Sequence, residues 1–138
     1  MKTVLMTGAA GDVGRRLRHE LAGKYRLRLS DVRQVTGLTP DETFQKANLR
    51  RLPEVMRAAR GVDAILHLGG FAVEGPWPQI LQANIVGAYN VFEAARRNGV
   101  RRVVFASTHH TLGFYPRTES VDHRAPPRPG CSRHPRCS

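Results

Sequence analysis

Apolar residues recur along most of the chain in two alternating patterns. Short apolar runs that end in a glycine or a polar residue predict buried strands, and longer stretches with apolar residues three and four apart predict amphipathic helices. Strands that alternate with helices predict a parallel sheet joined by right-handed crossovers. The expected strands are residues 2–7, 25–30, 43–45, 64–68 and 101–107, and the expected helices are residues 11–24, 52–59 and 78–97.

The helix expected over residues 78–97 is apolar on more than one face. Tyr89 and Val91 are among the apolar residues that lie outside its main stripe, so we expect a second, exposed apolar face beside the main one. The main stripe, expected to face the core, consists of Leu81, Ile85, Ala88, Phe92 and Ala95.

This order of elements predicts an α/β fold. Five strands are most, but not all, of a doubly wound nucleotide-binding sheet, so we expect an incomplete Rossmann-type parallel sheet over residues 1–123. Residues 124–138 differ in composition, with four of the nine Pro, both Cys and no acidic residue. Because this segment offers no face for a strand or a helix, we expect it to be a disordered tail.

The formal net charge is +11, from 22 Lys and Arg against 11 Asp and Glu. The basic residues are spread along the chain rather than gathered in one stripe, which indicates a solvated surface and no nucleic-acid partner. No apolar run reaches the roughly 18 residues that a membrane helix needs, and the N-terminal residues lack the features of a secretory signal. We therefore expect a cytoplasmic protein with no membrane partner.

The sharpest chemical signal is the stretch TGAAGDVG, which follows an expected strand and opens an expected helix. Gly8 permits a tight turn, Gly11 leaves room for a pyrophosphate, and Gly14 lets the helix and the strand pack closely. Asp31, at the end of the second strand, can accept both ribose hydroxyls of an adenosine and would repel a 2′-phosphate. Asp31 thus favours NAD over NADP, and the nearby Arg33 weakens this preference.

Three further motifs accompany the glycine-rich turn and Asp31: His67-Leu68-Gly69-Gly70, Asn84, and Phe105-Ala106-Ser107-Thr108. Together they resemble the extended short-chain dehydrogenase/reductase family, the NAD-dependent epimerase/dehydratases. The stretch from His67 to Thr118 is also similar to the uronate dehydrogenases, which oxidise C1 of galacturonate or glucuronate with NAD to an aldonolactone. The resemblance covers about residues 1–129. It implies NAD as cofactor, a sugar acid as substrate and a homo-oligomeric assembly.

The resemblance implies a set of cofactor-binding residues. The pyrophosphate would lie at the glycine-rich turn and the adenosine ribose at Asp31. Asn48 stands where the family commonly has an Asp beside the adenine, and its amide oxygen would accept from the exocyclic amine more weakly. The set implied for NAD is Gly8, Gly11, Asp12, Val13, Gly14, Asp31, Asn48, Leu49, Leu68, Gly69 and Gly70.

The resemblance also implies residues at the reaction centre. Thr108 matches the catalytic Ser/Thr whose hydroxyl bonds the reacting oxygen, and Asn84 matches a helix Asn tied to active-site organisation and a water relay. Ala72, Thr108, His109 and His110 match substrate-contacting positions. Uronate dehydrogenases more often have Ser where this chain has Ala72, and Asn where it has His109. The exact uronate specificity therefore stays open.

One part of the family's machinery is missing from the sequence. The base of this family is a Tyr with a Lys four residues later, which lowers the phenol pKa. None of the three Tyr residues is followed by such a Lys, and the only lysines are Lys2, Lys24 and Lys46. The Arg-, Pro- and Cys-rich run that follows Pro129 is typical of GC-rich DNA translated out of frame. We therefore expect a chain truncated by a frameshift near Pro129, and inactive or nearly so.

Other interpretations stay open. A nucleotide-sugar epimerase or dehydratase fragment would use the same scaffold, and a non-catalytic NAD-binding module would need no base. In the tail, Cys131, His134 and Cys137 are spaced by threes, but zinc prefers four ligands with tighter pairing, so we expect no metal site.

Overall fold

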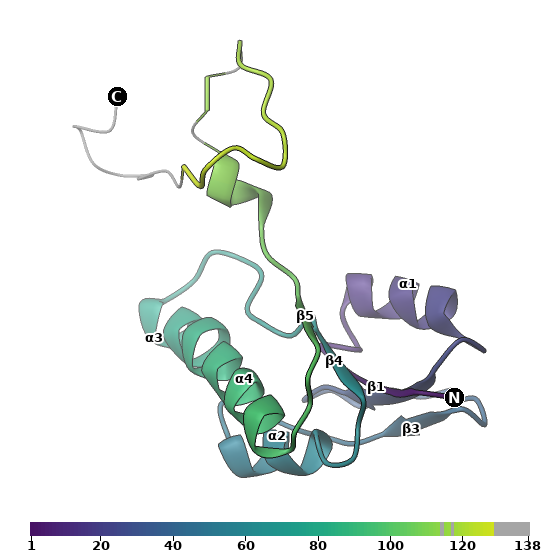
Figure 1. Ribbon diagram of the computed structural model, residues 1–138. Coiled ribbons are helices and arrows are strands. Elements are labelled where there is room, and N and C mark those ends of the chain that lie inside the picture. Colours follow the sequence, from purple (N-terminus) through teal and green to yellow (C-terminus); the bar gives the residue numbers. More distant parts are fainter. Residues whose placement is uncertain (114, 117, 129–138) are drawn as a thin grey trace. The chain divides into compact units, whose positions relative to one another are not determined.

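Five parallel strands form one sheet in the unit Met1–Ala106 (Figure 1). Their order across the sheet is β3-β2-β1-β4-β5, and every neighbouring pair is parallel. The chain passes from the edge strand β3 to β4, so the strand order reverses between β1 and β4, which confirms the predicted Rossmann-type sheet of five strands. The strands are β1 (Thr3–Thr7), β2 (Arg26–Ser30), β3 (Glu42–Phe44), β4 (Ala64–His67) and β5 (Val103–Phe105).

This computed structural model describes residues 1–113, 115–116 and 118–128. The chain divides into two compact units, Met1–Ala106 and Ser107–Ser138. The second unit contains a short 3₁₀ helix, η2 (His109–Leu112). A domain boundary after residue 123 stays a prediction. Of the expected tail, residues 124–128 are described and the remainder lies outside the described residues.

Helices cover both faces of the sheet (Figure 1). On one face, α1 (Asp12–Leu21) packs Leu17 and Leu21 against a cluster that includes Met6 and Leu29. On the other face, α2 (Leu52–Ala58) and α4 (Gly87–Arg97) pack against Leu5 and Ile65. Because alternate residues of β1 point to opposite faces, its Leu5 and Met6 belong to different clusters. Burial on both faces explains why the central strands β1 and β4 are nearly continuous apolar runs.

The long helix expected over residues 78–97 is a continuous helical segment with a π-helical part. It consists of α3 (Trp77–Ile80), the π-helix η1 (Leu81–Val86) and α4, and the backbone stays right-handed helical where one part passes into the next. A π-helical turn holds more residues than an α-helical turn, so it rotates the residues that follow it relative to those before it.

The predicted core-facing stripe of this helix is therefore wrong at Ile85 and Phe92, and it is confirmed at Ala95, which is buried in the core. Ile85 is 54% exposed and Phe92 is 49% exposed, whereas Val91 and Ala94 are fully buried. The physical reason is the π-helical turn, which shifts the helical register, together with the small residues that let α4 approach its neighbours closely. At Gly87, for example, a Cβ would lie 3.1 Å from a side-chain atom of Leu49.

Candidate functional site

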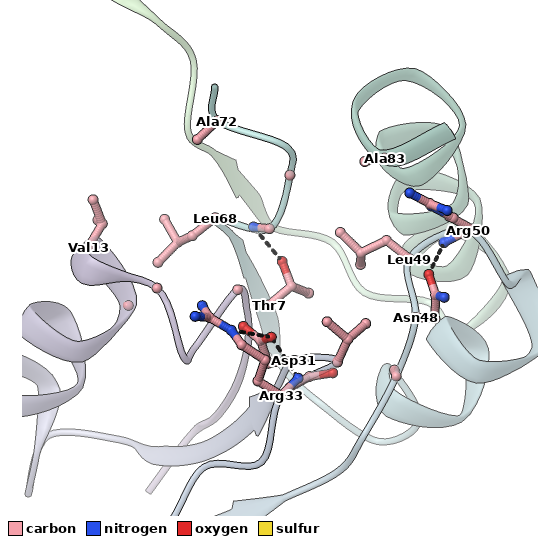
Figure 2. A pocket seen from close by; sticks show the side chains of 18 of the residues that line it. Thr7, Val13, Asp31, Arg33, Asn48, Leu49, Arg50, Leu68, Ala72 and Ala83 are labelled. Carbon is pink, nitrogen blue, oxygen red and sulfur yellow. Dashed lines mark hydrogen bonds and ion pairs between the residues drawn. The ribbon is translucent and has the colours of Figure 1, made fainter. Parts of the chain in front are cut away.

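A pocket of about 720 Å³ lies at the carboxyl ends of the central strands (Figure 2). The last residue of β1, Thr7, is paired in register with Ser30 of β2 and with His67 of β4. The pocket thus lies where the chain order reverses, which is the usual ligand position in open α/β sheets. Its lining residues are Thr7, Gly8, Gly11, Asp12, Val13, Gly14, Ser30, Asp31, Val32, Arg33, Ala47, Asn48, Leu49, Arg50, Leu68, Gly69, Gly70, Ala72 and Ala83.

The glycine-rich turn is packed too tightly for side chains at two of its glycines. Gly8 has a φ of 70°, and a Cβ there would lie 2.6 Å from the backbone nitrogen of Gly69. A Cβ on Gly14 would lie 2.5 Å from the carbonyl oxygen of Gly8. The turn therefore lies directly against the loop after β4, and α1 begins at Asp12 on the pocket wall. Backbone N–H groups at such a helix start are suited to bind phosphate.

Asp31 joins the end of β2 to the glycine-rich turn. Its Oδ2 accepts a hydrogen bond from the backbone N–H of Ala10 at 3.0 Å, and its Oδ1 accepts one from the backbone N–H of Arg33 at 3.0 Å. The side chain is only 9% exposed. Each carboxylate oxygen retains a further lone pair, so Asp31 can still accept from a ligand hydroxyl at the pocket.

A buried pair, Thr7 and His67, supports the floor of the pocket. Thr7 Oγ1 lies 2.7 Å from His67 Nδ1 and also accepts a hydrogen bond from the backbone N–H of Gly69 at 3.2 Å. Burial lowers the pKa of His67 to about 4, so the ring is neutral at neutral pH. The pair links β1 to β4 and to the glycine pair that lines the pocket.

Asn84, in the π-helix η1, binds the backbone of the loop that follows β4. Its Oδ1 accepts from the N–H of Phe71 at 2.6 Å, and its Nδ2 donates to the carbonyl of Phe71 at 3.0 Å. A Cβ on Gly70 would lie 2.9 Å from Asn84 Oδ1. Asn84 thus holds the loop that bears Ala72 at the pocket, while its role in a water relay stays a prediction.

Asn48 and Leu49 form the opposite wall, and Figure 2 shows them across the pocket from Val13. The side-chain oxygen of Asn48 accepts from the backbone N–H of Arg50 at 3.0 Å. The carbonyl of Leu49 accepts from Nδ2 of Asn90, a buried side chain of α4, at 2.7 Å. The wall is therefore fixed to α4, and one lone pair of the Asn48 amide oxygen is already used by the backbone.

Sequence and fold comparisons agree with this geometry. The model of the NAD dependent epimerase/dehydratase family matches residues 4–132. The chain belongs to this family. Its relatives include the uronate dehydrogenase of Pseudomonas syringae pv. tomato, which is 47% identical over 128 residues, covering 91% of this chain and 46% of that protein. The uronate dehydrogenase of Agrobacterium fabrum is 46% identical, with 94% of this chain and 49% of that protein covered.

Solved structures match the fold of this chain over part of their own length. A mutant uronate dehydrogenase from Agrobacterium tumefaciens, complexed with NAD, matches with a TM-score of 0.87 at 46% identity, covering 94% of this chain and 49% of that one. The UDP-glucose 4-epimerase of Thermus thermophilus, in complex with NAD, matches with a TM-score of 0.78 at 30% identity, covering 92% of this chain and 44% of that one. The epimerase/dehydratase-family chain described here spans about half the length of the curated relatives that it matches.

Within this family member, the predicted cofactor residues all line one pocket, and so does Ala72. The structure therefore brings together residues from the glycine-rich turn, from the end of β2 and from the segment before α2. Asn84 does not line the pocket and contacts its loop instead. Thr108, His109 and His110 belong to the other unit, where the carbonyl of Thr108 accepts from the N–H of Thr111 at 3.3 Å.

Several residues at the pocket of this epimerase/dehydratase-family chain were not predicted. Thr7 and Ser30 are the last residues of their strands, so the strand pattern alone could have placed them there. The others carry no comparable sequence signal, because a loop or the π-helix brings them to the wall. The additional lining residues are Thr7, Ser30, Val32, Ala47, Arg50 and Ala83.

Among the described residues, no group of three His, Cys, Asp or Glu side chains could hold a metal ion. No helix in the described part of the chain is long and apolar enough to cross a membrane. The candidate zinc ligands Cys131, His134 and Cys137 lie outside the described residues.

Proposed function

We propose that the pocket at the glycine-rich turn binds NAD. The proposal rests on three features that lie together at this pocket. They are Gly8 and Gly14, which have no room for a side chain, the start of α1, and the Asp31 carboxylate at the end of β2. The backbone N–H groups beside Gly11 would hold the pyrophosphate, and Asp31 would hold the adenosine ribose. Asn48 and Leu49 would border the adenine. Leu68, Gly69 and Gly70 would line the remainder of the cofactor.

We further propose that this chain corresponds to about half of an enzyme with a uronate-dehydrogenase-like function. NAD supplies the hydride acceptor for oxidation of C1 of a hexuronic acid to the aldonolactone. Thr108 would hydrogen-bond the reacting oxygen, Asn84 would organise the site, and Ala72, His109 and His110 would contact the substrate. The identities of 44–47% to uronate dehydrogenases support this interpretation.

The 138 residues contain no Tyr-x-x-x-Lys pair to remove the hydroxyl proton, so we propose that they bind NAD with turnover at or near the background rate. The measurement is NADH formation from NAD with galacturonate and with glucuronate, and UDP-glucose serves as the probe for the epimerase interpretation. We expect no uronate-dependent NADH. Clear turnover by this chain would contradict the proposed need for the pair.

Calorimetric titration with NAD tests the binding site itself, with Gly11→Val as the decisive variant. Gly11 has a φ of −79° and a ψ of 170°, which any residue adopts, and a Cβ there would lie 3.2 Å from the Gly8 carbonyl oxygen, so the turn must shift by a few tenths of an ångström, and the circular dichroism spectrum checks that the fold is kept. The substitution should leave the fold intact, place methyl groups at the phosphate position and weaken NAD binding by at least about tenfold, or about 1.4 kcal/mol. Ala22→Val, at the other end of α1, is the matched control and should bind like the unmodified chain. Equal affinity of all three chains would place NAD elsewhere.

A further inference from the structure

A cationic side chain shares the ribose end of the pocket with Asp31. Arg33 lines the pocket, and its side chain is 67% exposed. Figure 2 shows its guanidinium beside the Asp31 carboxylate. We propose that this pocket accepts NADP as well as NAD, with Arg33 binding the 2′-phosphate. This inference rests on the proposed binding of a nicotinamide dinucleotide.

The first argument concerns the charge of Asp31, which would otherwise repel a 2′-phosphate. Both of its carboxylate oxygens already accept a backbone N–H, one from Ala10 and one from Arg33. Its Oδ1 also lies 3.7 Å from Nε of Arg33. Two N–H dipoles and one full positive charge thus offset the carboxylate charge at the place where the phosphate would lie.

The second argument concerns the guanidinium of Arg33 itself. Its Nη2 donates to the carbonyl of Ala10 at 2.9 Å, so one hydrogen bond holds the side chain beside the glycine-rich turn. Within the described part of the chain, no second oxygen accepts from Nη2 and none accepts from Nη1. A planar guanidinium with N–H groups to spare suits a phosphate, and little further side-chain entropy is lost on binding.

The third argument is the charge around this end of the pocket. A neighbouring hollow of about 470 Å³ shares Val32 and Asn48 with the pocket, and Lys46 and Arg51 line it. The nearby acids are compensated, because Asp12 pairs with Arg15 and Glu54 pairs with Arg51. An additional dianionic phosphate therefore meets a positive potential rather than a negative one. With Arg51 paired to Glu54, the cations that remain to line the two hollows are Arg33, Lys46 and Arg50.

The test compares NAD with NADP, and ADP-ribose with 2′-phospho-ADP-ribose, by calorimetry at one fixed ionic strength. For the unmodified chain, the dissociation constants of the two ligands in each pair should differ by no more than about tenfold. Arg33→Ala should weaken only the phosphorylated ligands, by about tenfold or more, because it removes one charge-assisted contact. Arg33→Lys should restore part of the loss, since it keeps the charge but not the planar fork. Arg16→Ala, on the exposed face of α1, is the matched control.

The outcomes separate this inference from the function on which it rests. NAD binding without NADP binding, or an equal loss of both ligands in Arg33→Ala, would overturn the role of Arg33 and leave the NAD site standing. Failure of every dinucleotide to bind would overturn the proposed function itself. If Arg33→Ala lost the circular dichroism spectrum of the folded chain, Arg33→Gln, which can still donate to the Ala10 carbonyl, would replace it in the same titration.

Discussion

At the scale of single residues, burial controls the ionisation of His67. The side chain is 3% exposed, its ring centroid lies 5.4 Å from that of Phe105, and its Nδ1 lies 2.7 Å from Thr7 Oγ1. Burial lowers its pKa from 6.5 to about 4, and no carboxylate among the described residues opposes this shift. At neutral pH the ring is therefore neutral, which leaves one ring nitrogen able to accept from the Thr7 hydroxyl.

This lowered pKa makes stability depend on pH with a definite sign. Between about pH 6.5 and about pH 4 the unfolded chain binds a proton at His67 that the folded chain excludes. The free energy of unfolding should fall as the pH drops through this window, by at most about 1.4 kcal/mol per pH unit from this residue. Urea unfolding of the unmodified chain and of His67→Gln measures the effect, and the variant should have the flatter profile. The exposed His19→Gln should retain the steep one, and equal slopes in all three would show that His67 contributes none of this dependence.

At the scale of elements, the sequence locates helices and strands well but says less about what they face. All five strands lie at or close to their predicted positions, and the glycine spacing placed the turn on the pocket wall. The buried face of this helix was predicted correctly at Ala95 but not at Ile85 or Phe92, because a regular helical period takes no account of the π-helical turn. The contact of Asn84 with Phe71 and that of Thr7 with His67 join distant parts of the chain, so no local pattern could predict them.

The π-helical turn leads to a prediction about the loop after β4. Asn84→Ala removes both hydrogen bonds to the backbone of Phe71, so it should lower the free energy of unfolding by about 1–3 kcal/mol. It should also speed hydrogen exchange at the Phe71 amide far more than at the amides of β1, because the loop opens without global unfolding. Gln82→Ala, an exposed position of the same turn, is the control and should change neither quantity. Unchanged protection of the Phe71 amide would contradict the role given to Asn84.

At the scale of the whole molecule, a net charge of +11 coexists with an exposed apolar face on the unit Met1–Ala106. Tyr89 is 63% exposed, Phe92 49% and Phe105 47%. The rings of Phe92 and Phe105 have centroids 6.0 Å apart, so α4 and β5 form one continuous patch, which we call the Phe92 patch. The expectation of a second apolar face on this helix is confirmed for Tyr89, whereas Val91, expected there too, is fully buried.

The net positive charge and the exposed Phe92 patch have opposite effects on association in solution. The Phe92 patch favours association between copies of the chain, and the net positive charge opposes it by repulsion. Added salt screens the repulsion and leaves the apolar contact intact, so association should increase with ionic strength. Light scattering after size exclusion, at low and at high salt, measures this. Phe92→Ser should reduce the salt-induced association, whereas Leu38→Ser, which removes an exposed apolar side chain on a loop, should not. Association that weakens with salt would instead mean that charged contacts hold the copies together.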